Sequence, residues 1–202
     1  MEKDKEQAVN EPDIQYGYYS YADYLTWQFD VTVELIKGKI IKKAAAAPMR
    51  IHQRVSIKLA AKLYTFLEGH SCQVYDAPFD VRFPKGSKVD HQIRDVVQPD
   101  ICVICDTDKL DDRGCIGAPD LIVEILSPGN SQVELQNKYQ LYEENLVKEY
   151  WVIHPEEQTV LIHTLIEDKY QPSRLLTSGD VVESIAVQGF VLDLEEFVKD
   201  IE

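Results

Sequence analysis

The chain has 202 residues, a formal net charge of −14 and a hydrophobic content of 45%. That length supports one domain with a buried core. No apolar run reaches the length of a membrane span and the first residues are charged, so we expect a cytoplasmic protein with no signal peptide and no membrane partner. The net charge argues against a protein that coats nucleic acid through bulk electrostatics.

Acidic residues are concentrated at the two ends of the chain. Residues 1–13 contain five acids and two lysines, and residues 180–202 contain seven acids and one lysine. Residues 37–62, in contrast, contain eight Lys or Arg and no acid. The sequence therefore predicts a charged N-terminal tail over residues 1–13, a single domain over residues 14–202, and a locally basic face on an acidic protein.

Capping and turn residues divide the domain into helices and strands. Ser20 and Asp23 have the spacing of a capping box, and Lys37-Gly38 is typical of a hairpin turn. Pro48 begins and Gly69 ends a long amphipathic run. In chain order, the predicted elements are a helix at 21–27, a hairpin at 33–42, a helix at 48–68, strands at 72–83, 96–105 and 119–127, a helix at 131–145, a hairpin at 149–165, and a strand with a short helix at 189–201. This order predicts an α/β (α+β) domain with a mixed central sheet flanked by helices.

The four cysteines do not have the pattern of a zinc site. Cys102 and Cys105 have metal-ligand spacing, but they lie in one strand-like run, where residues three apart point to opposite faces of a sheet. Cys72 and Cys115 supply no second pair with suitable spacing. We therefore predict buried free thiols, which also fit a cytoplasmic protein.

Two carboxylates follow or interrupt apolar runs that are typical of buried strands. Glu124 lies in the middle of the run 121–126, and Asp100 comes directly before the run 101–104. A buried ionised carboxylate is costly unless a cation satisfies it, and two acids on neighbouring strands suit Mg²⁺. The alternatives are a paired or protonated buried glutamate at position 124 and a strand-initiating turn at position 100. We interpret Asp120, which also follows a proline, as such a turn.

Pro99-Asp100 followed by Glu124 resembles the Pro-Asp…(Asp/Glu)-x-Lys signature of the PD-(D/E)XK restriction-endonuclease-like nuclease superfamily. The longer runs VVQPDICVI, GAPDLIVEILSPGNS and KYQLYEENLVKEYWVIHP are similar to those of the Uma-type restriction endonucleases, over about residues 18–198. The resemblance implies a restriction-endonuclease-like fold and cleavage of DNA that depends on Mg²⁺, with Mn²⁺ as an alternative metal. It also implies a homodimer.

The resemblance also indicates further site residues. Position 126 is leucine where the superfamily has lysine, and in the resembling family a lysine of the next helix takes that place, which here is Lys138. Helical geometry lets Lys138 lean toward the sheet from the edge of an apolar stripe, although it could instead extend to solvent. The stripe consists of Leu135, Tyr139, Tyr142 and Leu146. The resemblance makes Glu34 a third site carboxylate. Its alternative is a strand acid on the surface.

The long helix offers one histidine and a basic stripe. His52 faces the core side near the start of the helix, where it could orient water or phosphate or be a structural histidine. Arg50, Arg54, Lys58 and Lys62 recur every four residues, which is typical of a solvated face but would also suit contact with DNA phosphates. We assign the contact to Arg50, Arg54 and Lys58. No aromatic residues interleave with them to stack single-strand bases.

These patterns together predict a metal-dependent endonuclease with Asp100, Glu124 and Glu34 at the metal and Lys138 and His52 beside it. A catalytically silent binding or scaffolding protein remains an alternative, favoured by the acidic surface and the displaced lysine. A paired-carboxylate glycoside hydrolase is a third interpretation, which is disfavoured because no sugar-stacking aromatic lies near either acid in the sequence.

Overall fold

The computed structural model describes residues 17–29, 31–42, 49–128, 130–199 and 201. The predicted N-terminal tail, the domain boundary after residue 13 and the helix start at Pro48 lie outside these residues. Within the described ranges, no helix is both long and apolar enough to cross a membrane.

A six-stranded sheet forms the centre of the fold. In spatial order its strands are β12 (Lys169–Pro172), β11 (Thr159–Ile166), β10 (Glu149–His154), β9 (Leu121–Ile125), β6 (Ile101–Ile104) and β3 (Gln73–Asp76). β9 and β10 pair in parallel, and the other neighbours are antiparallel. The predicted mixed central sheet is therefore confirmed.

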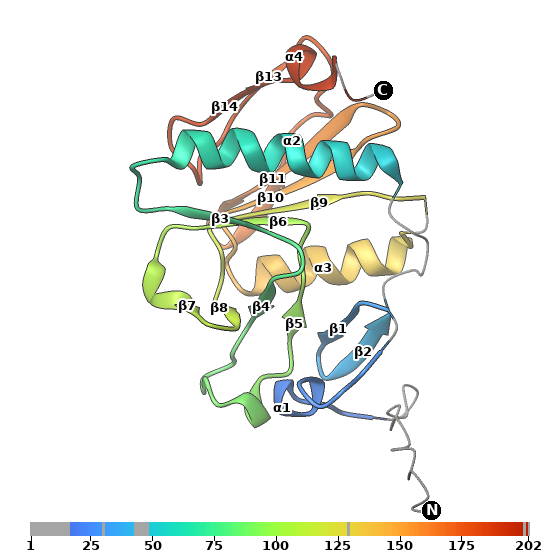
Figure 1. The fold of residues 1–202 in the computed structure, drawn as a ribbon, viewed down its shortest axis with the longest axis vertical. Coiled ribbons are helices and arrows are strands. Elements are labelled where there is room, and N and C mark those ends of the chain that lie inside the picture. The colour runs from blue at the N-terminus through green and yellow to red at the C-terminus, as the bar shows by residue number, and fades with distance from the viewer. Residues whose placement is uncertain (1–16, 30, 43–48, 129, 200, 202) are drawn as a thin grey trace, which may run out of the picture.

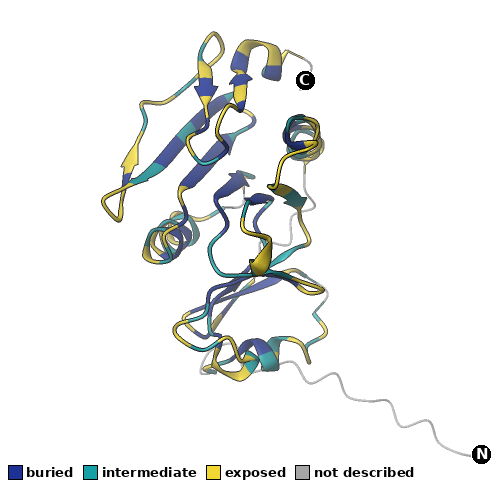
Figure 2. Ribbon diagram, turned by 90° about the vertical axis from the view of Figure 1, so that its left-hand side faces the viewer, coloured by how far each residue is buried: buried dark blue, intermediate teal, exposed yellow. Residues whose placement is uncertain are grey.

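Two long helices cover the two faces of this large sheet (Figure 1). α2 (Arg50–Leu67) lies on one face and packs Val55, Leu59 and Leu63 against it. α3 (Gln132–Glu144) lies on the other face. Figure 2 shows the strands between the helices as mostly buried, and all five residues of β9 are buried. A carboxylate on β9 is therefore shielded from water on both sides.

A second six-stranded sheet lies against the other side of α3. Its strands, in spatial order, are β2 (Lys39–Lys42), β1 (Val33–Ile36), β5 (Val96–Val97), β4 (Asp80–Arg82), β8 (Gly114–Ile116) and β7 (Leu110–Asp111). The short helix α1 (Tyr21–Tyr24) packs on this small sheet and begins with the predicted Ser20 capping box. α3 therefore lies between two sheets, with one apolar cluster shared by all three (Figure 1).

The C-terminal part of the chain completes the layer around α2. β13 (Val181–Glu183) and β14 (Val191–Asp193) form a separate hairpin, and α4 (Leu194–Val198) follows it. Apolar side chains of this segment join the same core cluster as α2. The short 3-10 turns Asp90–Gln92 and Thr107–Lys109 occur in connections.

Two segments that we predicted as single strands are each divided between the two sheets. Segment 72–83 forms β3 in the large sheet and β4 in the small one, and segment 96–105 forms β5 in the small sheet and β6 in the large one. The prediction of single strands was wrong because prolines interrupt both segments, at Pro78 and Pro99, and a proline has no N–H for a sheet ladder. Asp100 consequently lies where the chain passes from one sheet to the other.

A disulfide joins Cys72 to Cys105 across 33 residues of sequence. The antiparallel register pairs Gln73 with Ile104, so the two cysteines lie opposite each other just beyond the ends of β3 and β6. The prediction of free thiols is therefore wrong for this pair, because it considered each strand by itself. It is confirmed for Cys102 and Cys115, which are buried and free.

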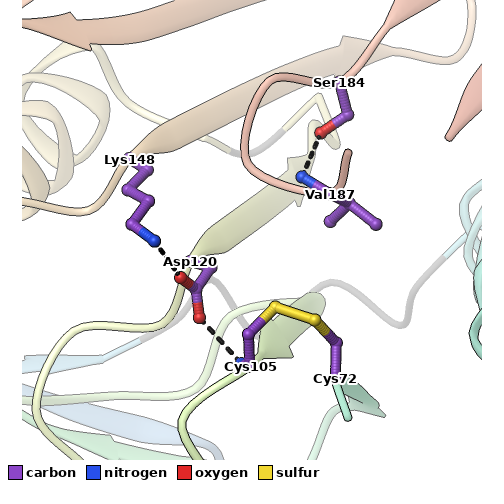
Figure 3. Close-up of a disulfide and its surroundings, with 6 residues drawn as sticks. All are labelled: Cys72, Cys105, Asp120, Lys148, Ser184 and Val187. Carbon is purple, nitrogen blue, oxygen red and sulfur yellow. Dashed lines mark hydrogen bonds and ion pairs between the residues drawn. A yellow bond between two sulfur atoms is a disulfide. The ribbon is translucent and has the colours of Figure 1, made fainter. Parts of the chain in front are cut away.

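Asp120 has a structural role beside the disulfide (Figure 3). Asp120 is 5% exposed, and its Oδ2 accepts the backbone N–H of Cys105 at 2.7 Å. Its Oδ1 lies 2.6 Å from the Lys148 ammonium. The interpretation of Asp120 as a turn residue at the start of β9 is confirmed. Cys102 and Cys105 pack in different core clusters, as expected for opposite faces of β6.

We expect Cys72→Ser to lower the free energy of unfolding by about 2–4 kcal/mol, because the unfolded chain loses a cross-link. Urea denaturation measures this, and a reducing agent should lower the stability of the wild type but leave that of Cys72→Ser unchanged. Thiol titration in denaturant should find the two free cysteines before reduction and all four after it. Four reactive thiols without reductant would contradict the disulfide.

Candidate active site

Asp100 and Glu124 come together because β6 and β9 are antiparallel neighbours. The last ladder pair is Ile101 with Val123, and one further step places Asp100 opposite Glu124. Residues directly opposite in such a pair project to the same face with Cβ atoms about 5 Å apart. Glu124 projects to the α3 side of the sheet, by alternation from Ile122. Asp100 lies just before the first residue of β6, at the end of the ladder, where His52 of α2 also reaches it.

Glu124 is held by two donors from α3. Its side chain is in the buried centre of β9, and the residue is 5% exposed. Its Oε1 lies 2.8 Å from the Lys138 ammonium and accepts the Tyr142 hydroxyl at 2.7 Å. Lys138 and Tyr142 are four residues apart, so they project from the same face of the helix. The buried carboxylate therefore has a cation and a neutral donor on one oxygen.

Lys138 links the two sheets. It is 1% exposed, and its ammonium also lies 3.1 Å from Oε1 of Glu34 on β1. Glu34 is fully buried, and the same oxygen accepts the backbone N–H of Gln98 at 3.0 Å. Because α3 lies between the sheets, one ammonium reaches a carboxylate of each (Figure 1).

Burial and charge act in opposite directions on the pKa of Lys138, but in the same direction on the pKa of Tyr142. Burial alone would lower the pKa of the Lys138 ammonium, but the charges of Glu124 and Glu34 and the hydrogen bond to Glu124 raise it above its ordinary value. Burial, together with the charges of Glu124 and Glu34, raises the pKa of the Tyr142 hydroxyl well above its ordinary range. Lys138 therefore remains an ammonium, and Tyr142 remains a neutral hydrogen-bond donor.

Asp100 occupies the more open side of the centre. Its Oδ2 accepts the backbone N–H of Ile125 at 2.7 Å, which anchors the side chain to β9. Nε2 of His52, in the first turns of α2, lies 3.4 Å from the same oxygen. The side chains of His52 and Asp100 are each 13% exposed, so solvent reaches this pair more than it reaches Lys138 or Glu34.

Comparison with known proteins identifies the family. The chain matches the family model Uma2, described as "Putative restriction endonuclease", over residues 21–195. The chain belongs to the Uma2 family. An uncharacterized protein, slr1290, of Synechocystis sp. is 22% identical over 148 residues, which cover 72% of this chain and 73% of that protein.

A solved structure has the same fold. It is described as a putative nuclease belonging to DUF820 from Anabaena variabilis, and it matches with a TM-score of 0.69 and 19% sequence identity. The match covers 91% of this chain and 99% of that one. The resemblance to the Uma-type family and the restriction-endonuclease-like fold class are therefore confirmed.

The structure places the five residues that we predicted to be catalytic in two groups of contacts: Glu34 and Glu124 with Lys138, and His52 with Asp100. The charge of Asp100 also acts on Lys138, so the two groups are neighbours. The basic residues along α2 differ in their surroundings. Arg50 and Arg54 are exposed, whereas the ammonium of Lys58 donates to the backbone oxygens of Glu196 and Phe197 at 3.1 and 2.8 Å. Lys58 therefore already binds the carbonyl groups of α4, which competes with a contact to DNA.

Sequence reasoning missed two residues of the centre. We interpreted Tyr142 only as part of the apolar stripe of α3, but its hydroxyl binds Glu124. Its position four residues after Lys138 could have indicated that role. Gln98 directly precedes Pro99-Asp100 and donates its backbone N–H to Glu34. Nothing in the sequence indicates that contact, because it depends on the pairing of β1 with β5.

Two of the candidate carboxylates suit a hard divalent cation. Asp100 and Glu124 face each other from neighbouring strands, and Mg²⁺ commonly binds one or two carboxylates together with water and phosphate oxygens. Two carboxylates, Glu34 and Glu124, contact the Lys138 ammonium, and the negative charge of Asp100 also acts on it. Among the residues that the structure describes, however, no group of three or more His, Cys, Asp or Glu side chains is close enough to hold a metal. The arrangement therefore supports a two-carboxylate site more than a three-carboxylate one.

We expect Lys138→Met to lower the free energy of unfolding by about 3–5 kcal/mol, because it leaves buried carboxylates without a cation. Urea denaturation measures the loss. Lys169→Met is the matched control, since the Lys169 ammonium makes a similar 3.0 Å contact with Glu143 but its side chain is 72% exposed. The control should change stability little. Equal effects of the two substitutions would contradict a structural role for the buried pair.

Proposed function

We propose that this protein is an endonuclease that hydrolyses phosphodiester bonds in DNA with the help of Mg²⁺ or Mn²⁺. The observation that carries the proposal is the opposition of Asp100 and Glu124 on β6 and β9, with the Lys138 ammonium 2.8 Å from Glu124. In a chain of the Uma2 family, described as restriction endonucleases, this combination supports a phosphodiesterase centre.

In the proposal, Asp100 and Glu124 hold the metal. The bound metal would neutralise charge on the scissile phosphate and lower the pKa of a water molecule. The Ile125 N–H fixes Asp100, and the Tyr142 hydroxyl fixes Glu124, so both carboxylates are oriented before a substrate binds. Such preorganisation is the main way in which a protein assists this chemistry.

Lys138 and its partners have a separate role in the proposal. The ammonium would stabilise negative charge that develops on the phosphate oxygens during hydrolysis. Glu34 holds Lys138 from the opposite side, at 3.1 Å, and is itself fixed by the Gln98 N–H. These contacts support a positioning role for Glu34, while its role as a third metal ligand remains a prediction.

His52, Arg50 and Arg54 would serve the open side of the centre. His52 is near enough to Asp100 to orient it, or to exchange a proton with a nearby water. Arg50 and Arg54 lie in the first turns of the same helix and are exposed, which supports contact with DNA phosphates beside the scissile bond.

Asp100→Ala and Glu124→Ala should each abolish Mg²⁺-dependent cleavage of DNA, because each removes one of the two carboxylates that would bind the metal. Cleavage of plasmid and short linear DNA measures activity, and circular dichroism checks that the fold survives. Glu143→Ala is the matched control: this carboxylate, in the last turn of α3, binds Lys169 and the Tyr170 N–H instead of the residues of the candidate site, so its loss should leave cleavage unchanged. Cleavage by either site variant at the wild-type rate would refute the assignment.

One observation favours a catalytically silent binding or scaffolding protein. Glu124 already has an ammonium and a phenol on one oxygen, as a purely structural buried glutamate would. Calorimetric titration with Mg²⁺ or Mn²⁺ separates the two functions. The nuclease proposal requires a binding signal in the wild type that Asp100→Ala and Glu124→Ala both remove. Absence of metal binding in the wild type would favour the silent protein.

The proposal includes a homodimer, in which two such centres would act on the two strands of a duplex. Its support is the resemblance to nucleases that pair their sites in this way. Sedimentation velocity of the full chain gives the oligomeric state directly, and a monomer at all concentrations would remove this part of the proposal.

A further inference from the structure

A cavity of about 380 Å³ lies on the α1 side of the small sheet. We refer to it as the aromatic cavity; it is lined by Tyr24, Trp27, Phe29, Val31, Thr32, Val33 and Gln98. All three rings are half-buried, so each also presents part of its surface to solvent. Cavities of this size that combine aromatic walls with a few polar groups are typical of binding sites for small organic groups.

The rings of the aromatic cavity support one another. The Trp27 ring centroid lies 5.8 Å from that of Tyr24 and 5.6 Å from that of Phe29. On its other side, Trp27 makes an edge contact with Tyr19 at 5.1 Å. The rings are therefore held in place before any ligand binds. A cation lies at the rim, since the Lys42 ammonium is 5.3 Å from the centre of the Phe29 ring.

Gln98 connects the aromatic cavity to the candidate active site. Its side-chain amide donates to the Tyr24 hydroxyl at 3.2 Å, inside the cavity, and to Asp80 at 2.8 Å. Its backbone N–H donates to Glu34, which contacts Lys138. Asp100 follows two residues later, a separation of about 7 Å along an extended chain. The cavity lies on the α1 face of the small sheet and Glu34 on its α3 face, so Gln98, just after β5, connects the two sites.

We propose that the aromatic cavity binds an unpaired nucleobase next to the scissile phosphate. This inference rests on the proposed nuclease function and assigns its substrate class: DNA with an unpaired base, either in a single strand or at an opened position within a duplex. Every nucleobase has a flat face that can stack on an aromatic ring, and Lys42 is placed to meet an adjacent phosphate. A base within a duplex is stacked between its neighbours, so it could enter the cavity only after leaving the stack.

Trp27 is both the proposed ligand contact and a reporter of binding. The chain has two tryptophans, and the other, Trp151, is fully buried in the core. Titration of the full chain with oligothymidylate of roughly 12 nucleotides, without divalent metal to prevent cleavage, should quench the Trp27 fluorescence as bases stack. A duplex of equal length serves as the second ligand, and fluorescence anisotropy of labelled DNA measures both affinities independently of tryptophan.

Trp27→Ala should raise the Kd for the single strand by about tenfold and leave the Kd for the duplex within about twofold of the wild type. Trp27→Phe, which keeps a stacking ring, should recover most of the single-strand affinity. The unchanged duplex Kd of Trp27→Ala separates the loss of stacking from a loss of folding. Phe29→Ala provides a second test of the same wall. Tyr64→Ala is the matched control, because Tyr64 is a 63% exposed aromatic on α2 that does not line the cavity.

An unchanged single-strand Kd in Trp27→Ala and Phe29→Ala would overturn the inference, and so would an equal loss of affinity for duplex and single strand. Quenching of Trp27 by a neutral oligosaccharide, but not by oligothymidylate, would overturn it in favour of a sugar site. The binding assay does not depend on cleavage. Base binding without metal-dependent hydrolysis would refute the proposed function alone, and hydrolysis that is insensitive to Trp27 would refute this inference alone.

Discussion

The ammonium of Lys138 lies between one carboxylate of each sheet, 2.8 Å from Glu124 and 3.1 Å from Glu34. Burial of three charges costs several kcal/mol per ion, and only close, well-aligned contacts offset that cost. α3 must therefore lie between the sheets at the depth and rotation that bring Lys138 to both acids. Tyr142 and the Gln98 N–H complete the contacts. The same requirement that satisfies the buried charges thus assembles the candidate active site.

β6 is anchored to neighbouring strands at both of its ends. At its start, Asp100 accepts the N–H of Ile125 and so ties β6 to β9. Just beyond its end, Cys105 is bound covalently to Cys72 and donates its N–H to Asp120, so the strand is anchored there to β3 and to the start of β9 (Figure 3). A strand fixed at both ends holds Asp100 in a constant position relative to Glu124. That rigidity suits a site in which two carboxylates share one cation.

Three consecutive residues between β5 and β6 each belong to a different feature of the fold. Gln98 borders the aromatic cavity and holds Glu34, Pro99 ends the ladder of the small sheet, and Asp100 begins the proposed metal site. An acidic chain repels nucleic acid through its overall field, so the proposed binding of DNA requires specific local contacts. Stacking on aromatic rings is such a contact, and it is less dependent on net charge than phosphate binding is.

The sequence alone determined the helices, most strands, the family resemblance and the candidate residues, since these depend on local periodicity and on spacing along the chain. It also indicated that a buried Glu124 needs a cation. Only the tertiary structure decided which residues meet: Cys72 with Cys105, Gln98 with Glu34, and Tyr142 with Glu124. Each of these contacts joins elements that are distant in the chain, through strand register or helix packing. The residue pattern within one segment does not indicate which distant segment it will contact. The division of two expected strands between the two sheets also depends on tertiary structure. The prolines allow each segment to break, but the packing around α3 decides which sheet each part joins.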